Sequence, residues 1–244
     1  MFVDGDFVVQ LPATLLGFQH VVQGRGGLDL RLLVAGPLEG HDGGLLGGGG
    51  IKDQPDDIVV PLGDYVDRGI DSRGVIDQLI ALAGHCRLVP ILGNHEEMLL
   101  GAREGRSDFR FWMNCGGITC LDSYGPTGRM DLIPREHFAF LQSCRTYFET
   151  ERHFFVHANY EPDVPLDRQT LHTLRWLSLR DYVPPAPHCS AKVAIVGHTP
   201  QHEILDLGYL KCLDTRCCHG GWLTALDVNS GQVWQVNERG ERRS

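Results

Sequence analysis

Two copies of one local pattern constrain this chain more than any other feature of its sequence. Each copy is a short apolar run that ends in glycine and a compact oxygen ligand, first in Val59-Val-Pro-Leu-Gly-Asp64 and again in Val89-Pro-Ile-Leu-Gly-Asn94. Apolar residues between the copies, from Val75 to Ala83, recur at the spacing of a helix face. The stretch therefore predicts a strand–helix–strand unit whose parallel strands place Asp64 and Asn94 at the same carboxyl edge of a sheet.

Two further apolar runs end in a histidine. Phe154-Phe-Val156 leads into His157, and Ala194-Ile-Val-Gly197 leads into His198. A single histidine after an apolar strand is more often a hydrogen-bonded core or loop residue than a ligand. Here four strand ends each carry a metal-type ligand, namely one Asp, one Asn and two His. Together they predict a site for a divalent metal such as manganese, iron or zinc.

The composition argues against several other functions. The 244 residues suffice for one large α/β domain with a substantial core. The net charge of −9, with no basic cluster beyond the short tail at residues 239–244, argues against nucleic-acid binding. No apolar run reaches the roughly 20 residues of a membrane span, and no signal peptide is evident. None of the eight cysteines forms a Cys-x-x-Cys pair, so we expect free thiols in a cytoplasmic protein.

The amino-acid composition of the chain changes near Asp53. Residues 1–52 contain 13 of the 30 glycines, four of them in a row at Gly47 to Gly50. We interpret this segment as an atypical start that is either not native to the domain or disordered. Within it, Phe7-Val8-Val9 and Leu28 to Val34 are candidate strands. Residues 53–238 then form the main domain, and residues 239–244 form a basic tail.

The main domain has the pattern of alternating strands and helices. The candidate strands are residues 57–62, 87–92, 153–156, 192–196, 209–213, 222–228 and 232–236, and the candidate helices are residues 95–104, 134–148 and 167–179. We expect residues 105–132 to form a lid or an excursion from the sheet. The last four strands follow each other closely, so we expect that end of the chain to be antiparallel.

Three motifs resemble the phosphoprotein phosphatase family of binuclear metallophosphoesterases. They are Gly63-Asp-Tyr-Val-Asp-Arg-Gly69, Gly93-Asn-His-Glu96 and Val196-Gly-His-Thr-Pro200, and the segments 155–160 and 213–227 also match. The likeness covers about residues 54–237 and is greatest to the compact bacterial and phage serine/threonine phosphatases. It implies an α/β fold of the calcineurin-like type, a mixed β-sandwich flanked by helices.

The resemblance also implies a role for each ligand. Asp64 would bridge two divalent metal ions, for which manganese is expected and iron or zinc would also serve. Asn94, His157 and His198 would ligate the second ion. Two cations about 3.5–4 Å apart supply a hydroxide near neutral pH and hold the phosphoryl oxygens for in-line displacement.

The resemblance assigns four more residues to catalysis and substrate binding. His95 would protonate the departing alkoxide, and Asp67 would orient His95 and support its charged form. Arg68 would hold the phosphate oxygens through its forked donors. A second phosphate contact is expected in the segment after the third motif, where we predict Arg175, with Arg180 as the alternative.

One departure from the family concerns its first motif. The family begins with Gly-Asp-x-His-Gly about thirty residues before the Asp64 loop, and that Asp and His ligate the first metal. Here the region reads Leu33-Val-Ala-Gly-Pro-Leu-Glu-Gly-His-Asp-Gly43, and the motif is absent from the whole chain. We therefore predict an incomplete first metal site and a chain that is weakly active or inactive.

Three functions follow from these observations. The leading one is a metal-dependent serine/threonine phosphatase that acts on phosphoproteins. The second is a dinucleoside polyphosphate hydrolase of the same fold. Those relatives tend to replace the Asp67-type residue and to end the second motif in Asp, whereas this chain has Asp67 and Glu96. The third is a catalytically impaired binding module, suggested by the missing first motif.

Overall fold

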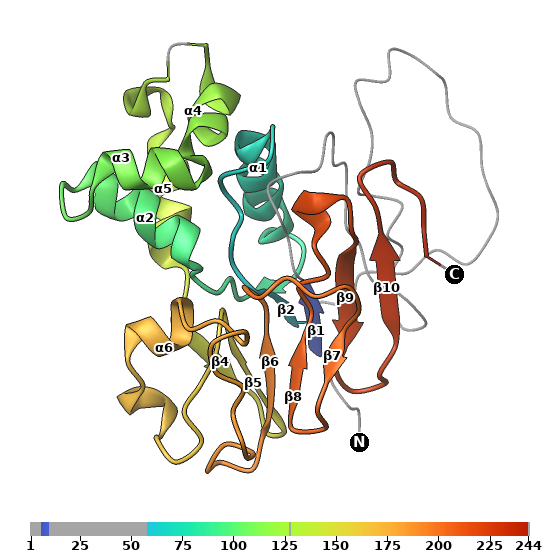
Figure 1. Ribbon diagram of the computed structural model, residues 1–244. Helices are drawn as coiled ribbons and strands as arrows, with labels where there is room; N and C mark the ends of the chain where they lie inside the picture. Colours follow the sequence, from blue (N-terminus) through green and yellow to red (C-terminus); the bar gives the residue numbers. More distant parts are fainter. Residues whose placement is uncertain (1–5, 10–57, 127, 244) are drawn as a thin grey trace, which may run out of the picture.

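Two five-stranded β-sheets form the middle of the computed structural model, which describes residues 6–9, 58–126 and 128–243 (Figure 1). The first sheet has the order β10-β9-β1-β2-β3, and the second has the order β4-β5-β6-β8-β7. The first sheet comprises β1 (Asp6–Val9), β2 (Ile58–Pro61), β3 (Arg87–Leu88), β9 (Leu223–Asp227) and β10 (Val233–Val236). The second comprises β4 (Tyr147–Glu149), β5 (His153–Val156), β6 (Val193–Val196), β7 (Leu205–Asp206) and β8 (Leu210–Cys212).

Each sheet has three parallel strands. In the first sheet β1, β2 and β3 pair in parallel, β9 runs antiparallel to β1, and β10 runs antiparallel to β9. In the second sheet β5, β6 and β8 run parallel, while β4 and β7 are antiparallel edges. Parallel strands end at a common edge, which is where open α/β sheets bind ligands.

The inner faces of the two sheets pack against each other. Nine buried apolar residues form this layer: Val60, Leu62, Val89, Ile91, Phe148, Phe155, Ile195, Leu213 and Leu226. The arrangement is a mixed β-sandwich, as predicted from the sequence. Within the described residues, no helix is both long and apolar enough to cross a bilayer.

Helices cover the sandwich on two sides (Figure 1). Five of them share one apolar core and lie together: α1 (Ser72–Leu82), α2 (Asn94–Arg103), α3 (Phe109–Trp112), α4 (Ile118–Tyr124) and α5 (Arg135–Ser143). The short α6 (Leu171–Arg175) instead packs against the second sheet. The expected lid at residues 105–132 is part of the five-helix layer, because it contains α3 and α4 and because Trp112 is fully buried there.

Three secondary-structure predictions need correction. The predicted helix 134–148 stops at Ser143, and Phe148 lies in β4, where its ring stacks on Phe155 at 5.9 Å. The predicted helix 167–179 is reduced to α6 and a single 3-10 turn before it. The last strands are not all antiparallel, because the two-residue β7 pairs with β8 and leaves β8 parallel to β6.

Other predictions are confirmed. The strand at residues 153–156 has the predicted bounds, and the run Phe7-Val8-Val9 lies in β1. The candidate strand from Leu28 to Val34 lies outside the described residues, as does most of the glycine-rich segment 1–52.

Candidate metal centre and active site

Four side chains from four strand ends meet at one point. Asp64 follows β2 by three residues, Asn94 is the first residue of α2, His157 follows β5 directly, and His198 follows β6 by two residues. The Nε2 atom of His157 lies 3.2 Å from Asp64 Oδ1, 3.0 Å from Asn94 Oδ1 and 3.2 Å from His198 Nδ1. Ligand atoms about 2.1 Å from one cation and at right angles lie about 3.0 Å apart. The four predicted ligands therefore have the spacing of a single coordination sphere.

The atoms that face this point all carry lone pairs. His157 donates its Nδ1 proton to the carbonyl of Leu62 at 2.6 Å, and His198 donates its Nε2 proton to the carbonyl of Trp176 at 3.1 Å. Since a carbonyl only accepts, the other nitrogen of each neutral ring is a bare acceptor. These two nitrogens face the carboxylate of Asp64, and the Oδ1 of Asn94 lies 3.1 Å from His198 Nδ1. Converging lone pairs repel each other unless a cation lies between them, so this set fits a metal.

The electrostatics of the site favour the ligand forms of these residues. Burial lowers the pKa of His157 and lowers that of His198 to about 4, which keeps both rings neutral near pH 7. Burial raises the pKa of Asp64, but in the acidic range where this carboxyl titrates the rings of His157, His95 and His198 are protonated, and their charges lower its pKa to about 2. A metal requires neutral imidazoles and an ionised carboxylate. Asp64, Asn94, His157 and His198 would hold it.

The loop that carries Asp64 depends on a glycine. Gly63 has φ of 98°, and a Cβ there would lie 2.6 Å from His157 Nδ1 and 2.8 Å from the Cα of Gly93. No larger side chain fits between these groups. The glycine before the ligand in the first motif thus lets the strand end approach the neighbouring loop and the histidine.

Unusual backbone conformations gather at the same place. Six described non-glycine residues have positive φ, and five of them lie in the loops around the site: Asp64, Asp67, Arg68, His198 and Arg216. Such conformations cost of order 1–3 kcal/mol each and persist where surrounding contacts fix them. Their concentration marks this edge as the functional part of the fold.

Glu96 fixes the Asp64 loop from the second motif. Its fully buried carboxylate accepts backbone N–H groups of Asp64 (2.9 Å), Tyr65 (2.6 Å) and Val66 (3.2 Å), and also that of Gly93 (2.9 Å). One side chain therefore connects the loops that deliver Asp64 and Asn94. The shorter side chain of Asp would not span the same donors.

A buried pair lies next to the ligands. The Nδ1 atom of His95 is 2.7 Å from Asp67 Oδ2, and both residues are almost completely buried. Trp112 donates its indole N–H to the same carboxylate, 3.0 Å from each oxygen. The hydroxyl of Ser72 accepts the backbone N–H of Asp67 at 3.2 Å. These contacts fix the carboxylate and turn the other ring nitrogen of His95 away from it.

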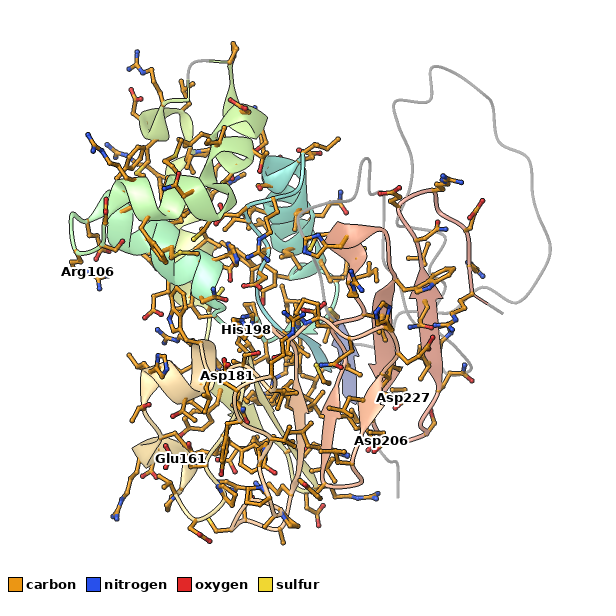
Figure 2. All side chains as sticks on the ribbon, in the orientation of Figure 1. Arg106, Glu161, Asp181, His198, Asp206 and Asp227 are labelled. Carbon is orange, nitrogen blue, oxygen red and sulfur yellow. The ribbon has the colours of Figure 1, made fainter. Side chains whose placement is uncertain are left out.

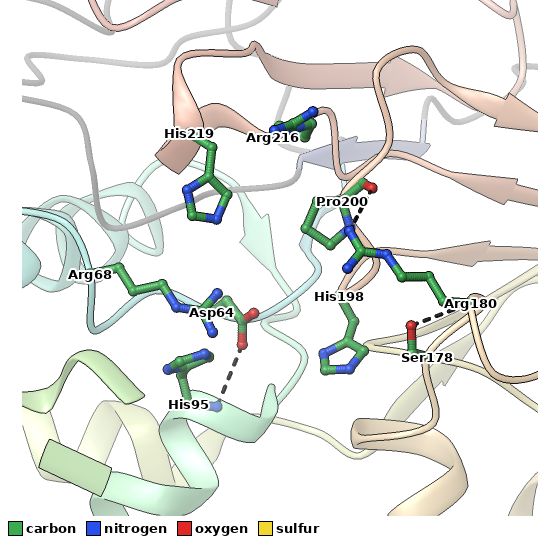
Figure 3. A pocket seen from close by; sticks show the side chains of 9 residues that line it. All are labelled: Asp64, Arg68, His95, Ser178, Arg180, His198, Pro200, Arg216 and His219. Atoms are coloured by element: carbon green, nitrogen blue, oxygen red, sulfur yellow. Dashed lines mark hydrogen bonds between the residues drawn. The ribbon is translucent and has the colours of Figure 1, made fainter. Parts of the chain in front are cut away.

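A cavity of about 670 Å³ opens above these groups. Nine residues line it: Asp64, Arg68, His95, Ser178, Arg180, His198, Pro200, Arg216 and His219 (Figure 3). Figure 2 places His198 in the interior, where the helices and sheets meet, whereas Arg106, Glu161 and Asp206 lie at the periphery. The arrangement combines a metal-ligand set, a histidine paired with a carboxylate, and several guanidinium groups in one cavity.

The sequence of this site matches a known family. The model of the calcineurin-like phosphoesterases matches residues 45–228. The chain belongs to the calcineurin-like phosphoesterase family. Members of this family depend on a binuclear metal centre, which agrees with the resemblance found in the motifs.

Individual calcineurin-like relatives include different phosphatases. Serine/threonine-protein phosphatase 1 of Salmonella typhimurium strain LT2 is 28% identical over 183 residues, which are 72% of this chain and 81% of that protein. A solved structure provisionally assigned as a diadenosine tetraphosphatase has a TM-score of 0.57 at 22% identity, covering 74% of this chain and 80% of its own. A cold-active protein tyrosine phosphatase has a TM-score of 0.53 at 18% identity, covering 77% and 67%. The two structures share the fold.

The predicted phosphate contact at Arg175 needs correction. Arg175 does not line the cavity, and its guanidinium is 2.8 Å from the carboxylate of Glu97 and 2.8 Å from Thr146 Oγ1. Glu97 also accepts the indole N–H of Trp176 at 2.7 Å, and the carbonyl of Trp176 accepts the proton of His198. Arg175 thus holds Glu97, which in turn holds Trp176, the residue whose carbonyl orients the metal ligand His198. Arg180, the alternative, lines the cavity together with Arg68.

Several residues of this calcineurin-like site were not found by the sequence patterns. Trp112 contacts Asp67 across 45 positions of sequence, for which no local signal exists. Arg216 and His219 follow β8, whose last residue Cys212 pairs with Val196 of the parallel β6. The loop after β8 therefore reaches the same edge as His198. The expected antiparallel pairing of these strands concealed that relation.

The strand β1 is parallel to β2, with Val9 opposite Pro61, and so it points to the same edge as Asp64. Residues 10–57, which include the region where the family's first motif is expected, are outside the described ranges, and the predicted loss of the first metal site stays a prediction. Among the described residues, Asp64, His157 and His198 are the one group of three that could hold an ion.

Proposed function

We propose that this chain is a metal-dependent serine/threonine phosphatase that hydrolyses phosphomonoesters of phosphoproteins. The observation that carries the proposal is the buried His95–Asp67 pair at 2.7 Å, beside the four converging ligands. The name of the relative from Salmonella typhimurium supports the same class. Bound divalent cations would neutralise phosphoryl charge and lower the pKa of water at the site.

Three side chains that line the cavity have roles in the proposed reaction. Arg68 and Arg180 line it with guanidinium groups that suit the oxygens of a phosphate. His95 holds a proton on the ring nitrogen that does not face Asp67. Burial lowers the pKa of His95, but the charges of Asp64 and Asp67 outweigh burial and raise it above its ordinary value. The raised pKa favours the protonated ring of His95, which can deliver its proton to the leaving oxygen.

The need for this proton depends on the leaving group. The alkoxide of serine or threonine is a much stronger base than a phenolate, and it leaves only when it is protonated. The phenolate of tyrosine, with a conjugate acid of pKa about 10, needs the proton less. The nucleotide that leaves a dinucleoside polyphosphate departs through a phosphate oxygen, which is a weaker base still. A buried, oriented acid thus favours an alkyl phosphoester.

The test compares leaving groups in the presence of manganese. We expect turnover of a phosphoserine peptide, and we expect His95→Asn to reduce it about 100-fold while reducing p-nitrophenyl phosphate turnover much less. The metal content of the variant should match that of the parent. Diadenosine tetraphosphate hydrolysed faster than the phosphopeptide would replace this proposal with the second function. Absence of any hydrolysis above blank, with phosphate still bound, would replace it with the binding module.

A further inference from the structure

The cavity contains more positive charge than one phosphate needs. Arg68, Arg180 and Arg216 all line it, and among its lining residues the one carboxylate, that of Asp64, belongs to the metal-ligand set. The proposed substrate phosphate is matched by Arg68, Arg180 and the metal site. Arg216 is left over, on a chain whose net charge is −9.

Arg216 comes from its own loop, between β8 and β9. Figure 3 shows it beside His219, across the cavity from His95, with Arg68 and Arg180 on either side. Arg68, Arg180 and Arg216 come from three separate loops, so the extra guanidinium is not a neighbour in sequence of either phosphate contact. It occupies a different part of the cavity wall.

The backbone of Arg216 is fixed by its surroundings. Its φ is 63°, and its N–H donates to the side chain of Asp214 at 3.1 Å. Thr215 Oγ1 donates to the carbonyl of Trp222 at 2.6 Å and closes the loop. A Cβ on Gly221 would lie 2.1 Å from the carbonyl oxygen of Thr215, so the loop closes this tightly only with glycine there. These contacts therefore hold the backbone that carries the guanidinium in one conformation.

The charge of Arg216 is not neutralised by the protein. Its guanidinium contacts a ring nitrogen of His202 at 2.9 Å, and no carboxylate in the described part of the chain pairs with it. The same holds within those ranges for Arg68 and for Arg180. The guanidinium of Arg180 donates to the carbonyl of Pro200 at 3.5 Å. By contrast, the peripheral Arg243 pairs with Glu203 at 2.7 Å. An unpaired guanidinium in a concave site is suited to an anion brought by the substrate.

We propose that Arg216, with His219 beside it, binds a second anionic group of the substrate next to the scissile phosphate. The proposal rests on the proposed function and narrows its substrate class to phosphorylated segments with an acidic neighbour. A carboxylate and a second phosphate both supply the required charge. The partner is thus recognised by its charge in addition to the phosphoester that is cleaved.

The test uses three synthetic peptides with one central phosphoserine. Its neighbours are alanine in the first peptide, glutamate in the second and a further phosphoserine in the third. Binding is measured by calorimetry in the His95→Asn background, where slow turnover keeps the peptides intact, and kcat/KM is measured in the parent. We expect both acidic peptides to be favoured about fivefold over the alanine peptide, the ratio that one partly exposed charge pair supplies. The preference should shrink as ionic strength rises.

Two variants and one control assign the preference to this residue. Arg216→Gln should bring the ratio of acidic to alanine peptide close to one, and Arg216→Gly should do the same without strain at the positive φ. Arg110→Gln removes an equal charge from the exposed surface of α3 and should leave the ratio unchanged. Comparison of the glutamate and phosphoserine arms shows which anion is preferred.

The outcomes separate this inference from the proposed function. Hydrolysis of all three peptides without preference, or a preference that survives both Arg216 variants, would overturn the second anion site and leave the phosphatase proposal intact. An Arg216-dependent preference in binding, without hydrolysis of any peptide, would support the anion site and refute the phosphatase proposal. A preference in both measurements that both Arg216 variants abolish would support the two together.

Discussion

Replacement of Glu96 by glutamine should destabilise the fold and weaken metal binding together. The Glu96 carboxylate accepts four backbone N–H groups, two on each oxygen. In Glu96→Gln an NH₂ group replaces one oxygen, so two buried N–H donors face another donor. Each buried donor left unpaired costs about 1–3 kcal/mol, which gives roughly 2–6 kcal/mol for two.

Thermal unfolding measures this loss directly. For a chain of this size 1 kcal/mol corresponds to about 2–4 °C, so we expect the midpoint to fall by about 10 °C. The control is Glu151→Gln, which changes an exposed carboxylate in the turn before β5. Metal content after dialysis should fall in the same variant, because Asp64 and Gly93 lose their common anchor.

One result would refute this reasoning. If the midpoint of Glu96→Gln stayed within about 2 °C of the parent, the four contacts would not require an ionised carboxylate. The Glu96 side chain would then already carry a proton in the folded chain, and its role in fixing Asp64 would need another explanation.

Three further changes test the groups around the ligands. Asp67→Asn removes one of the two carboxylate charges, those of Asp64 and Asp67, that raise the pKa of His95, so the protonated form is lost at lower pH and the alkaline limb of a kcat profile should move down in pH. His95→Asn should leave the metal stoichiometry at the parental value, and loss of metal would show that His95 is a ligand. Glu97→Gln weakens the support of Trp176, whose carbonyl orients His198, and should weaken metal affinity about tenfold in a chelator titration. Unchanged affinity would limit Glu97 to a structural ion pair.

The sequence predicted the ligands because their signal is local. Each of Asp64, Asn94, His157 and His198 directly follows an apolar run, and parallel strands bring such positions to one edge without further information. The same patterns located β5 and the helix that follows Asn94. The roles of these residues stay predictions until metal is measured.

Contacts between residues far apart in the sequence could not be predicted from these local patterns. The apolar spacing of residues 134–148 is compatible with a helix, but the chain leaves α5 after Ser143 because Arg145 bonds to the carbonyl of Pro90 at 2.7 Å and Phe148 joins the sheet. The contact between Trp112 and Asp67 likewise depends on how the five helices pack. A strand of two residues, β7, gives almost no periodic signal, and its omission reversed the expected direction of β8 relative to β6.

The left-handed residues around the cavity have a consequence for engineering. Arg216 holds a conformation that glycine adopts without strain, and no carboxylate among the described residues pairs with its side chain, so glycine at this position would relieve backbone strain at little cost. A library selected for heat resistance alone should therefore enrich glycine at this position and lose the proposed second anion contact. Stability and substrate preference oppose each other at this loop, and a directed-evolution experiment on this chain would have to select for both at once.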